Sequence, residues 1–196
     1  MTNPVDAVHV RVATADDLPA IRALIPLSVR GLSGGYYTPE QIESAIRYVF
    51  GPDTQLIADG TYLVAERGGA MAGCGGWSRR RTLYGGDQAK EVEDPLLDPA
   101  TEPARIRAFF VHPEHARRGV GSRIMDACVD AARAAGFRAL ELASTLPGEP
   151  LYRAFGFEAV EQIHSTLPDG VEVRFIRMAR PIDPPDVRPN DPTCWS

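Results

Sequence analysis

A short segment with two glycines carries the clearest chemical signal in the chain. After an apolar, strand-like stretch, the sequence runs through a basic loop to Arg-Arg-Gly-Val-Gly-Ser at residues 117–122. Gly119 and Gly121 have no side chain to block an approaching anion, so the neighbouring backbone amides can point outward. A helix that begins here adds the positive end of its dipole, and Arg117 and Arg118 add charge. The segment is therefore a candidate phosphate-binding nest.

Three other interpretations compete for these glycines. A dinucleotide-binding fingerprint needs a third glycine directly after a strand, but Ile124 stands at that position, although Glu141 lies at a suitable distance downstream. A nucleotide P-loop needs a closing Gly-Lys-Ser/Thr, which the sequence does not have. An isolated Gly-x-Gly is most often an ordinary turn before a helix. A second motif argues against this last interpretation.

The second motif is Leu-Tyr-Arg-Ala-Phe-Gly-Phe at residues 151–157, which follows a strand-like stretch at 137–143. Together, Arg-Arg-Gly-Val-Gly-Ser and Tyr-x-x-x-Gly-Phe resemble the motifs of the GNAT family of acyl-CoA-dependent N-acyltransferases, and the resemblance extends coarsely from Val8 to Arg180. In that family the first motif, Gln/Arg-x-x-Gly-x-Gly/Ala, binds the pyrophosphate of the coenzyme. The chain departs from it at Ala116, where the family has Gln or Arg. Backbone amides make most of the phosphate contacts, so the departure weakens the match only slightly.

The resemblance implies a fold, a cosubstrate and site residues. The expected fold is a mixed α/β structure, with a central mixed, mostly antiparallel sheet and helices on both faces. Two central parallel strands splay, and the pantetheine of acetyl-CoA lies between them. Tyr152 corresponds to the tyrosine that commonly protonates the leaving thiolate in the family, since a phenol with a pKa of about 10 is neutral at physiological pH. Packing at the end of a short helix is the alternative role for Tyr152. The residues expected to contact the coenzyme are Phe109, Phe110, Val111, Arg117, Arg118, Gly119, Val120, Gly121 and Ser122.

Length and charge place the chain among single-domain proteins with small-molecule partners. With 196 residues and 44% hydrophobic content, it can bury one sizeable core. We expect one acyltransferase domain over 1–180 and a separate tail rich in Pro and Asp over 181–196. The net charge of -5 argues against a general nucleic-acid or membrane-surface binder. The tail is also a segment that two copies could exchange in a homodimer.

The cysteines and the N-terminus predict a cytoplasmic protein without a metal site. Cys74, Cys128 and Cys194 are odd in number, and their spacing matches no metal-binding pattern. Cys74 and Cys128 fall within apolar periodic segments, so we interpret them as small buried hydrophobes rather than nucleophiles. The sequence begins without the apolar run of a signal peptide and has no segment long enough to span a bilayer.

Periodicity and turn signals predict alternating strands and helices. The clearest helix start is Thr38-Pro39-Glu40-Gln41, which has the composition of a capping box with proline at the first helical position. The long connection at 79–104 has no strong periodicity, and its Gly85-Gly86 favours a flap on the acceptor side of a cleft. Strands are expected at 8–12, 61–66, 71–78, 105–111, 137–143, 157–166 and 171–180, and helices at 18–29, 39–49, 122–135 and 150–155.

The general base has no clear candidate. Many members of the family carry Glu or His on the strand that leads to the phosphate loop, but here the positions on the same face hold Arg105 and Arg107, which cannot accept a proton. Backbone amides of residues 109–111 are expected to contact the acyl carbonyl and pantetheine. Relay through water is one route for the proton, and the side chains that remain as candidate bases are Glu66, Glu141, His112 and Tyr84.

Two functions remain open at this point. The first is an N-acetyltransferase that moves the acetyl group of acetyl-CoA to a primary amine of a small molecule. The second is a non-catalytic module that binds or senses acyl-CoA and has lost its base. If Arg105 and Arg107 face the acceptor cleft, the acceptor should carry a carboxylate or phosphate near its amine. The alternative is that both arginines pair with carboxylates of the chain, such as Glu66 or Glu141.

Overall fold

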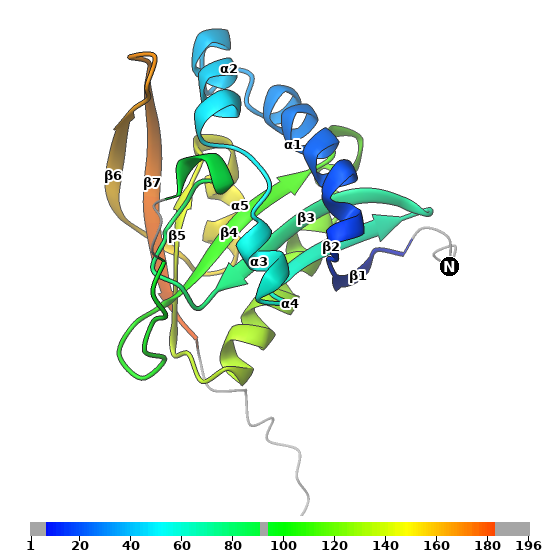
Figure 1. The fold of residues 1–196 in the computed structure, drawn as a ribbon, viewed down its shortest axis with the longest axis vertical. Helices are drawn as coiled ribbons and strands as arrows, with labels where there is room; N and C mark the ends of the chain where they lie inside the picture. Colours follow the sequence, from blue (N-terminus) through cyan, green and yellow to red (C-terminus); the bar gives the residue numbers. More distant parts are fainter. Residues whose placement is uncertain (1–6, 91–93, 183–196) are drawn as a thin grey trace, which may run out of the picture.

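The computed structural model describes residues 7–90 and 94–182, which form a seven-stranded sheet with helices on both faces (Figure 1). The strands are β1 (His9–Val12), β2 (Tyr62–Arg67), β3 (Ala70–Ser78), β4 (Ala104–Val111), β5 (Ala139–Ser144), β6 (Glu158–Thr166) and β7 (Glu172–Pro181). The α-helices are α1 (Leu18–Leu32), α2 (Pro39–Tyr48), α3 (Thr54–Ala58), α4 (Val120–Ala134) and α5 (Glu149–Ala154). Short 3-10 helices are η2 (Ala15–Asp17), η3 (Asp87–Ala89), η4 (Pro113–His115) and η5 (Leu146–Gly148).

The sheet is mostly antiparallel. Its strand order is β1-β2-β3-β4-β5-β7-β6, and the pair β4–β5 is parallel while the other neighbouring pairs are antiparallel. Helix α4 connects the parallel strands. The expected α/β fold, with a mixed sheet and a strand–helix–strand unit before the second motif, is confirmed.

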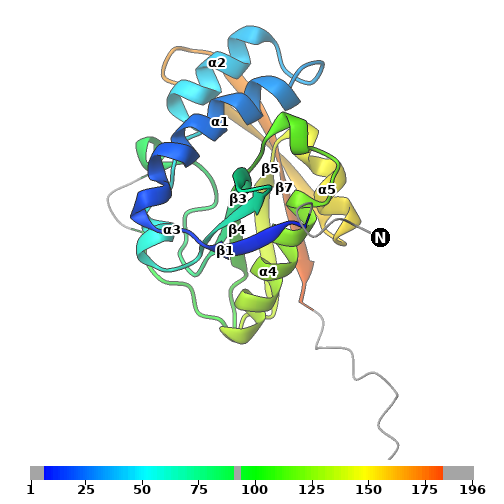
Figure 2. The ribbon, with the colours of Figure 1, turned by 90° about the vertical axis from the view of Figure 1, so that its right-hand side faces the viewer.

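Alternation along β2 divides the interior into two layers. Tyr62 and Val64 pack with residues of α1 and α3, whereas Leu63 and Ala65 pack with residues of α4, because successive side chains of a strand point to opposite faces. Figure 2 shows the same arrangement edge-on, with α1, α2 and α3 on one side of the sheet and α4 and α5 on the other. Among the described residues, no helix has the length and apolar character needed to cross a membrane.

Side-chain N-caps explain where helices α2 and α3 begin. The Thr38 hydroxyl accepts a hydrogen bond from the Gln41 amide at 3.2 Å, and the Gln41 side chain accepts one from the Thr38 amide, so the predicted capping box begins α2. Helix α3 was not predicted, although Asp53 supplies an N-cap by accepting a hydrogen bond from the Leu56 amide. Asp53 is fully buried.

A β-bulge near the end of β4 changes which side chains point to each face of the sheet. Gly76 of β3 lies opposite Arg107, but Cys74 lies opposite Phe110, so two residues of β4 occupy the place of one on β3. Ala108, in the bulge, has a φ of 54°. The glycine-rich β3 makes room for this irregularity, as its glycines predicted, because a Cβ on Gly75 would lie 2.6 Å from the ring of Phe109.

The parallel strands separate after a short paired stretch. β4 and β5 pair only at Ala104 with Leu140 and at Arg105 with Glu141. Beyond these pairs the two strands continue to residues 111 and 144 without facing partners in each other. The expected splay of the central strands is therefore present.

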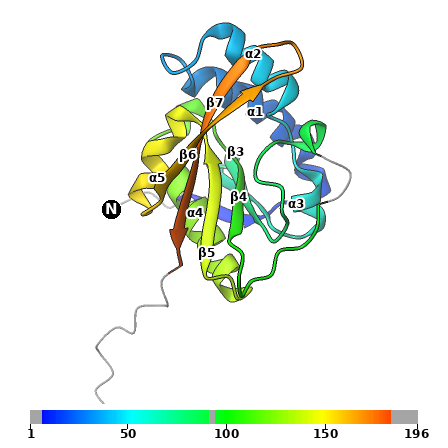
Figure 3. The ribbon, with the colours of Figure 1, turned by 90° about the vertical axis from the view of Figure 1, so that its left-hand side faces the viewer.

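The β6–β7 hairpin reaches toward α2, as Figure 3 shows. The Gln41 side chain donates a hydrogen bond to the Glu172 carbonyl, and the Ser44 hydroxyl donates one to the Asp169 carboxylate. At its other end β7 includes Pro181, and Ile182 is buried in the core. The expected tail at 181–196 included these two residues, but the structure places them in the domain. The rest of the predicted tail, and with it the suggested exchange between two copies, lies outside the described residues.

Burial should make two of the cysteines unreactive. Cys74 and Cys128 are both fully buried, and burial raises the pKa of Cys74 to about 12 and that of Cys128 further. Because the thiolate is the nucleophile, we expect iodoacetamide at pH 8 to alkylate Cys74 roughly 10³-fold more slowly in the folded protein than in denaturant. Peptide mass spectrometry measures this at each cysteine. Equal rates in both conditions would contradict the interpretation of these thiols as inert core residues.

Candidate active site

The splay between β4 and β5 opens into the larger of two adjoining cavities. This cavity has a volume of about 690 Å³. Its wall is formed by α1, by the end of β4 and the start of α4, and by the segment 145–154 that follows β5. The cavity is large enough for an elongated ligand, because ligand pockets commonly have volumes of roughly 300–1,000 Å³.

The predicted phosphate nest lies at one end of this cavity. Gly119 caps α4 with a left-handed backbone (φ 82°), and Arg117 is also left-handed (φ 62°). The first helical hydrogen bond runs from the Arg123 amide to the Gly119 carbonyl, at 3.0 Å. Within the described chain, none of the amides of residues 117–122 donates to another protein group. These free donors, at the positive end of a 15-residue helix, can bind a phosphate.

Most residues expected to contact the coenzyme line this cavity. Arg118 is the exception, since it does not contribute to the lining and its neighbour Arg117 does. Helix α4 begins at Val120 rather than at Ser122, because Gly119 already serves as the N-cap. The expected coenzyme-contacting residues that line the cavity are Phe109, Phe110, Val111, Arg117, Gly119, Val120, Gly121 and Ser122.

One of the three amides expected to contact the coenzyme is already bonded. The Val111 amide donates to the hydroxyl of Ser28 at 3.1 Å, so it is not free for a carbonyl of the coenzyme. Ser28 comes from α1, is buried, and also lines the cavity. Sequence reasoning missed Ser28, because a serine within an amphipathic helix does not reveal which backbone group of another element it contacts.

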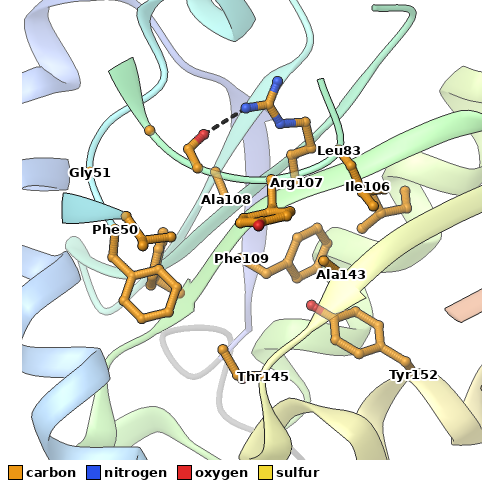
Figure 4. Close-up of a pocket in the computed structure, with 15 residues that line it drawn as sticks. Phe50, Gly51, Leu83, Ile106, Arg107, Ala108, Phe109, Ala143, Thr145 and Tyr152 are labelled. Carbon is orange, nitrogen blue, oxygen red and sulfur yellow. Dashed lines mark hydrogen bonds between the residues drawn. The ribbon is translucent and has the colours of Figure 1, made fainter. Parts of the chain in front are cut away.

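Tyr152 stands where the larger cavity meets a smaller one. Its ring packs edge-on against Phe109 and Phe157, with centroids 6.3 and 5.9 Å away. Burial raises the pKa of Tyr152, and the neighbouring Cys128 adds a smaller increase. Within the described chain its hydroxyl makes no hydrogen bond, and Figure 4 shows that the oxygen points toward Phe109. The phenol is therefore neutral and available to donate a proton.

The smaller cavity has a volume of about 80 Å³ and is shown in Figure 4. It shares five residues with the larger cavity, which places the two spaces in contact near Tyr152. The segments at 49–51 and 83–86 form its outer walls, and β4 forms its floor. The shared residues are Phe50, Phe109, Phe110, Thr145 and Tyr152.

The two arginines of β4 pair with carboxylates of the chain. Arg105 forms an ion pair with Glu141, which also pairs with Arg177. Arg107 lines the smaller cavity, but its guanidinium points away from Tyr152 and donates to the Gly85 carbonyl at 2.6 Å (Figure 4). It also lies 3.0 Å from the carboxylate of Asp53. The expectation of an acidic acceptor required a free guanidinium, so this structure removes the reason for it.

The candidate bases lie away from the two cavities or are already bonded. Glu66 pairs with Arg11 on the β1–β2 edge of the sheet, and Glu141 is held between two arginines. The ring nitrogen Nδ1 of His112 accepts a hydrogen bond from the Glu114 amide. Tyr84 alone of the four lines a cavity, where its ring packs against Phe175. Among the described residues, no Asp, Glu or His lines either cavity.

The fold is shared with solved N-acetyltransferases. A GCN5-related N-acetyltransferase from Rhodopseudomonas palustris matches with a TM-score of 0.66 at 20% identity, over 92% of this chain and 98% of that one. The PaiA N-acetyltransferase from Thermoplasma acidophilum, solved with coenzyme A, matches with a TM-score of 0.60 at 14% identity, over 89% and 99% of the chains. A GNAT family acetyltransferase from Brucella melitensis, solved with acetyl-CoA, matches with a TM-score of 0.53 at 19% identity, over 91% and 90%.

A family model gives the assignment that these low identities cannot give. No curated protein matches the chain. The model of the acetyltransferase (GNAT) family matches residues 29–157, which include both sequence motifs, the splayed strands and Tyr152. The chain therefore belongs to the GNAT family of acetyltransferases.

Proposed function

We propose that the protein is an N-acetyltransferase that moves the acetyl group of acetyl-CoA to a primary amine of a small molecule. One observation carries the proposal: a single cavity has free backbone amides at a helix N-terminus at one end and an unbonded tyrosine hydroxyl at the other. Family membership and the coenzyme complexes of relatives support acetyl-CoA as the cosubstrate.

Each end of the cavity has a separate task in this proposal. Acetyl-CoA supplies an activated acetyl thioester. The amides of residues 117–122 bind its pyrophosphate and so fix the position of the thioester along the cavity. When the amine attacks the thioester carbonyl and the C–S bond breaks, Tyr152 donates its phenolic proton to the departing sulfur. The attacking nitrogen becomes cationic as the N–C bond forms and loses one proton to water, because no Asp, Glu or His among the described residues lines either cavity, and the Tyr152 phenolate then regains a proton from water.

That same lack of a base in the described lining favours one alternative, a protein that binds or senses acyl-CoA without catalysis. The two functions differ in one measurement. With saturating acetyl-CoA and a panel of primary amines, an enzyme releases free CoA thiol in proportion to added amine. A binding module shows acetyl-CoA binding by calorimetry without any amine-dependent thiol release.

The nest predicts a charge-sensitive binding site. A Glu side chain at position 121 places a carboxylate among the amides that bind phosphate, so Gly121→Glu should weaken acetyl-CoA binding by about 10²-fold or more. Gly121→Ala is the control for bulk, because its Cβ would come closest to the end of the flexible Leu151 side chain, at 3.1 Å. We expect it to lose much less affinity. Isothermal titration calorimetry measures both variants, and equal affinities in folded protein would mean that the loop is only structural.

The hydroxyl of Tyr152 can be tested separately from its ring. Tyr152→Phe removes the proton donor and keeps the packing against Phe109 and Phe157, so acetyl-CoA affinity should be nearly unchanged. Loss of a general acid lowers the rate by roughly 10²- to 10⁴-fold, and we expect kcat to fall by this amount. Steady-state kinetics with the best amine of the panel gives both values. A decrease in kcat smaller than about threefold would assign proton donation to another group.

The raised pKa of Tyr152 also predicts the alkaline side of the pH profile. A raised pKa keeps the phenol protonated beyond its ordinary value of about 10, so the donor form persists as pH increases. We expect kcat to show no decrease between pH 7 and about 9.5. A descending limb with an apparent pKa below about 9 in the wild type, absent from Tyr152→Phe, would show that the phenol ionises too easily for this role.

A further inference from the structure

We infer that Arg107, Asp53 and Asp94 form a clamp that fixes the outer wall of the smaller cavity and thereby limits the size of the amine that reacts. This inference rests on the proposed function, because it treats the smaller cavity as the acceptor site. The three residues are positioning residues: both carboxylates pair with Arg107, whose guanidinium points away from Tyr152 (Figure 4).

The wall consists of two segments joined by backbone hydrogen bonds. The Gly86 amide donates to the Val49 carbonyl at 2.8 Å, and the Asp87 amide donates to the Pro52 carbonyl at 3.0 Å. The Thr54 amide donates to the carboxylate of Asp87, also at 3.0 Å. The two segments, 49–54 and 83–90, therefore form one hydrogen-bonded unit.

The clamp attaches this piece to the sheet. From the floor of the cavity, the guanidinium of Arg107 donates to the Gly85 carbonyl and lies 3.0 Å from Asp53 and 3.9 Å from Asp94. Asp53 also binds the ammonium of Lys90 and caps α3. Asp53 of the first wall segment, the Gly85 carbonyl of the second and Asp94 just beyond it thus converge on one arginine of β4.

Burial makes this attachment hard to release. The side chains of Arg107 and Asp53 are 1% and 0% exposed, so separating them would leave a buried ion without its partner. Residues 83–86 of the predicted flap at 79–104 line the smaller cavity, which this inference treats as the acceptor site. The segment is held in place, because Arg107 of β4 binds its Gly85 carbonyl and its own Lys90 binds Asp53.

Close packing of two glycines sets the dimension of the wall. A Cβ on Gly86 would lie 2.8 Å from three backbone atoms of Gly51, so any side chain at this position must push the two segments apart. The backbone of Gly86 has an ordinary φ of -81°, which alanine adopts without strain. The cavity behind this contact measures about 80 Å³. An apolar cavity of about 150 Å³ accommodates benzene in another protein, so the wild-type site should favour amines with a smaller body.

Gly86→Ala tests the inference without removing a charge. The measurement is kcat/KM for ethylamine, butylamine and phenethylamine, at saturating acetyl-CoA. We expect the wild type to prefer ethylamine. In the variant, the kcat/KM for phenethylamine divided by that for ethylamine should rise about tenfold, since a change in pocket size alters substrate preference by roughly this factor. The KM for acetyl-CoA should not change. Gly34→Ala is the matched control, because a Cβ there meets nothing within 4 Å, and its ratio should equal that of the wild type.

Asp53→Asn tests the clamp itself. Asparagine keeps the shape and the oxygen that caps α3 but removes the charge that Arg107 binds, so the same ratio should rise in a folded variant, as judged by thermal unfolding. A ratio within twofold of wild type for Gly86→Ala, in an active enzyme, overturns the inference and leaves the acetyltransferase proposal standing. A wild type that releases no CoA with any amine overturns both. The Gly86→Ala comparison decides the inference even when Asp53→Asn does not fold.

Discussion

The structure depends on how soon two parallel strands stop pairing. β4 and β5 share two residue pairs, and then each strand continues alone toward the same end of the sheet. Beyond these pairs, the backbone N–H and C=O groups that would bond a neighbouring strand instead line a cavity. The bulge at Ala108 is part of the same arrangement, because it turns Phe110 toward the α1 side and leaves Phe109 beside Tyr152.

Charge is handled differently at the two ends of the site. At the nest, donors have no partner in the described chain and await an anion. At the smaller cavity, the guanidinium of Arg107 and the carboxylate of Asp53 neutralise each other inside the protein. An exposed pair would contribute little to stability, but a buried pair is costly to break and so defines one geometry. In the proposed function, the nest attracts the coenzyme by charge and the smaller cavity selects the amine by shape.

The sequence predicted the parts of the molecule that are specified locally. The capping box of α2, the hairpin strands and the Gly-x-Gly nest each depend on a few consecutive residues, and the structure has them. Tyr152 was found through the resemblance rather than through its own surroundings. The partners of Arg107 and of the Val111 amide could not be predicted, because Asp53 and Ser28 lie far from them in the chain. The N-cap pattern at Asp53-Thr54 was the one available signal for α3.

A ligand that fills the large cavity stabilises the folded protein and so slows its degradation. A cavity of about 690 Å³ along the splayed strands is lined by partly buried apolar residues such as Phe109 and Leu151, whose open faces a ligand can cover. A ligand that binds only the native state at 100 times its Kd stabilises that state by about 2.7 kcal/mol. If the ligand is acetyl-CoA, a cell with abundant acetyl-CoA would protect this protein from proteolysis, and a starved cell would lose it faster.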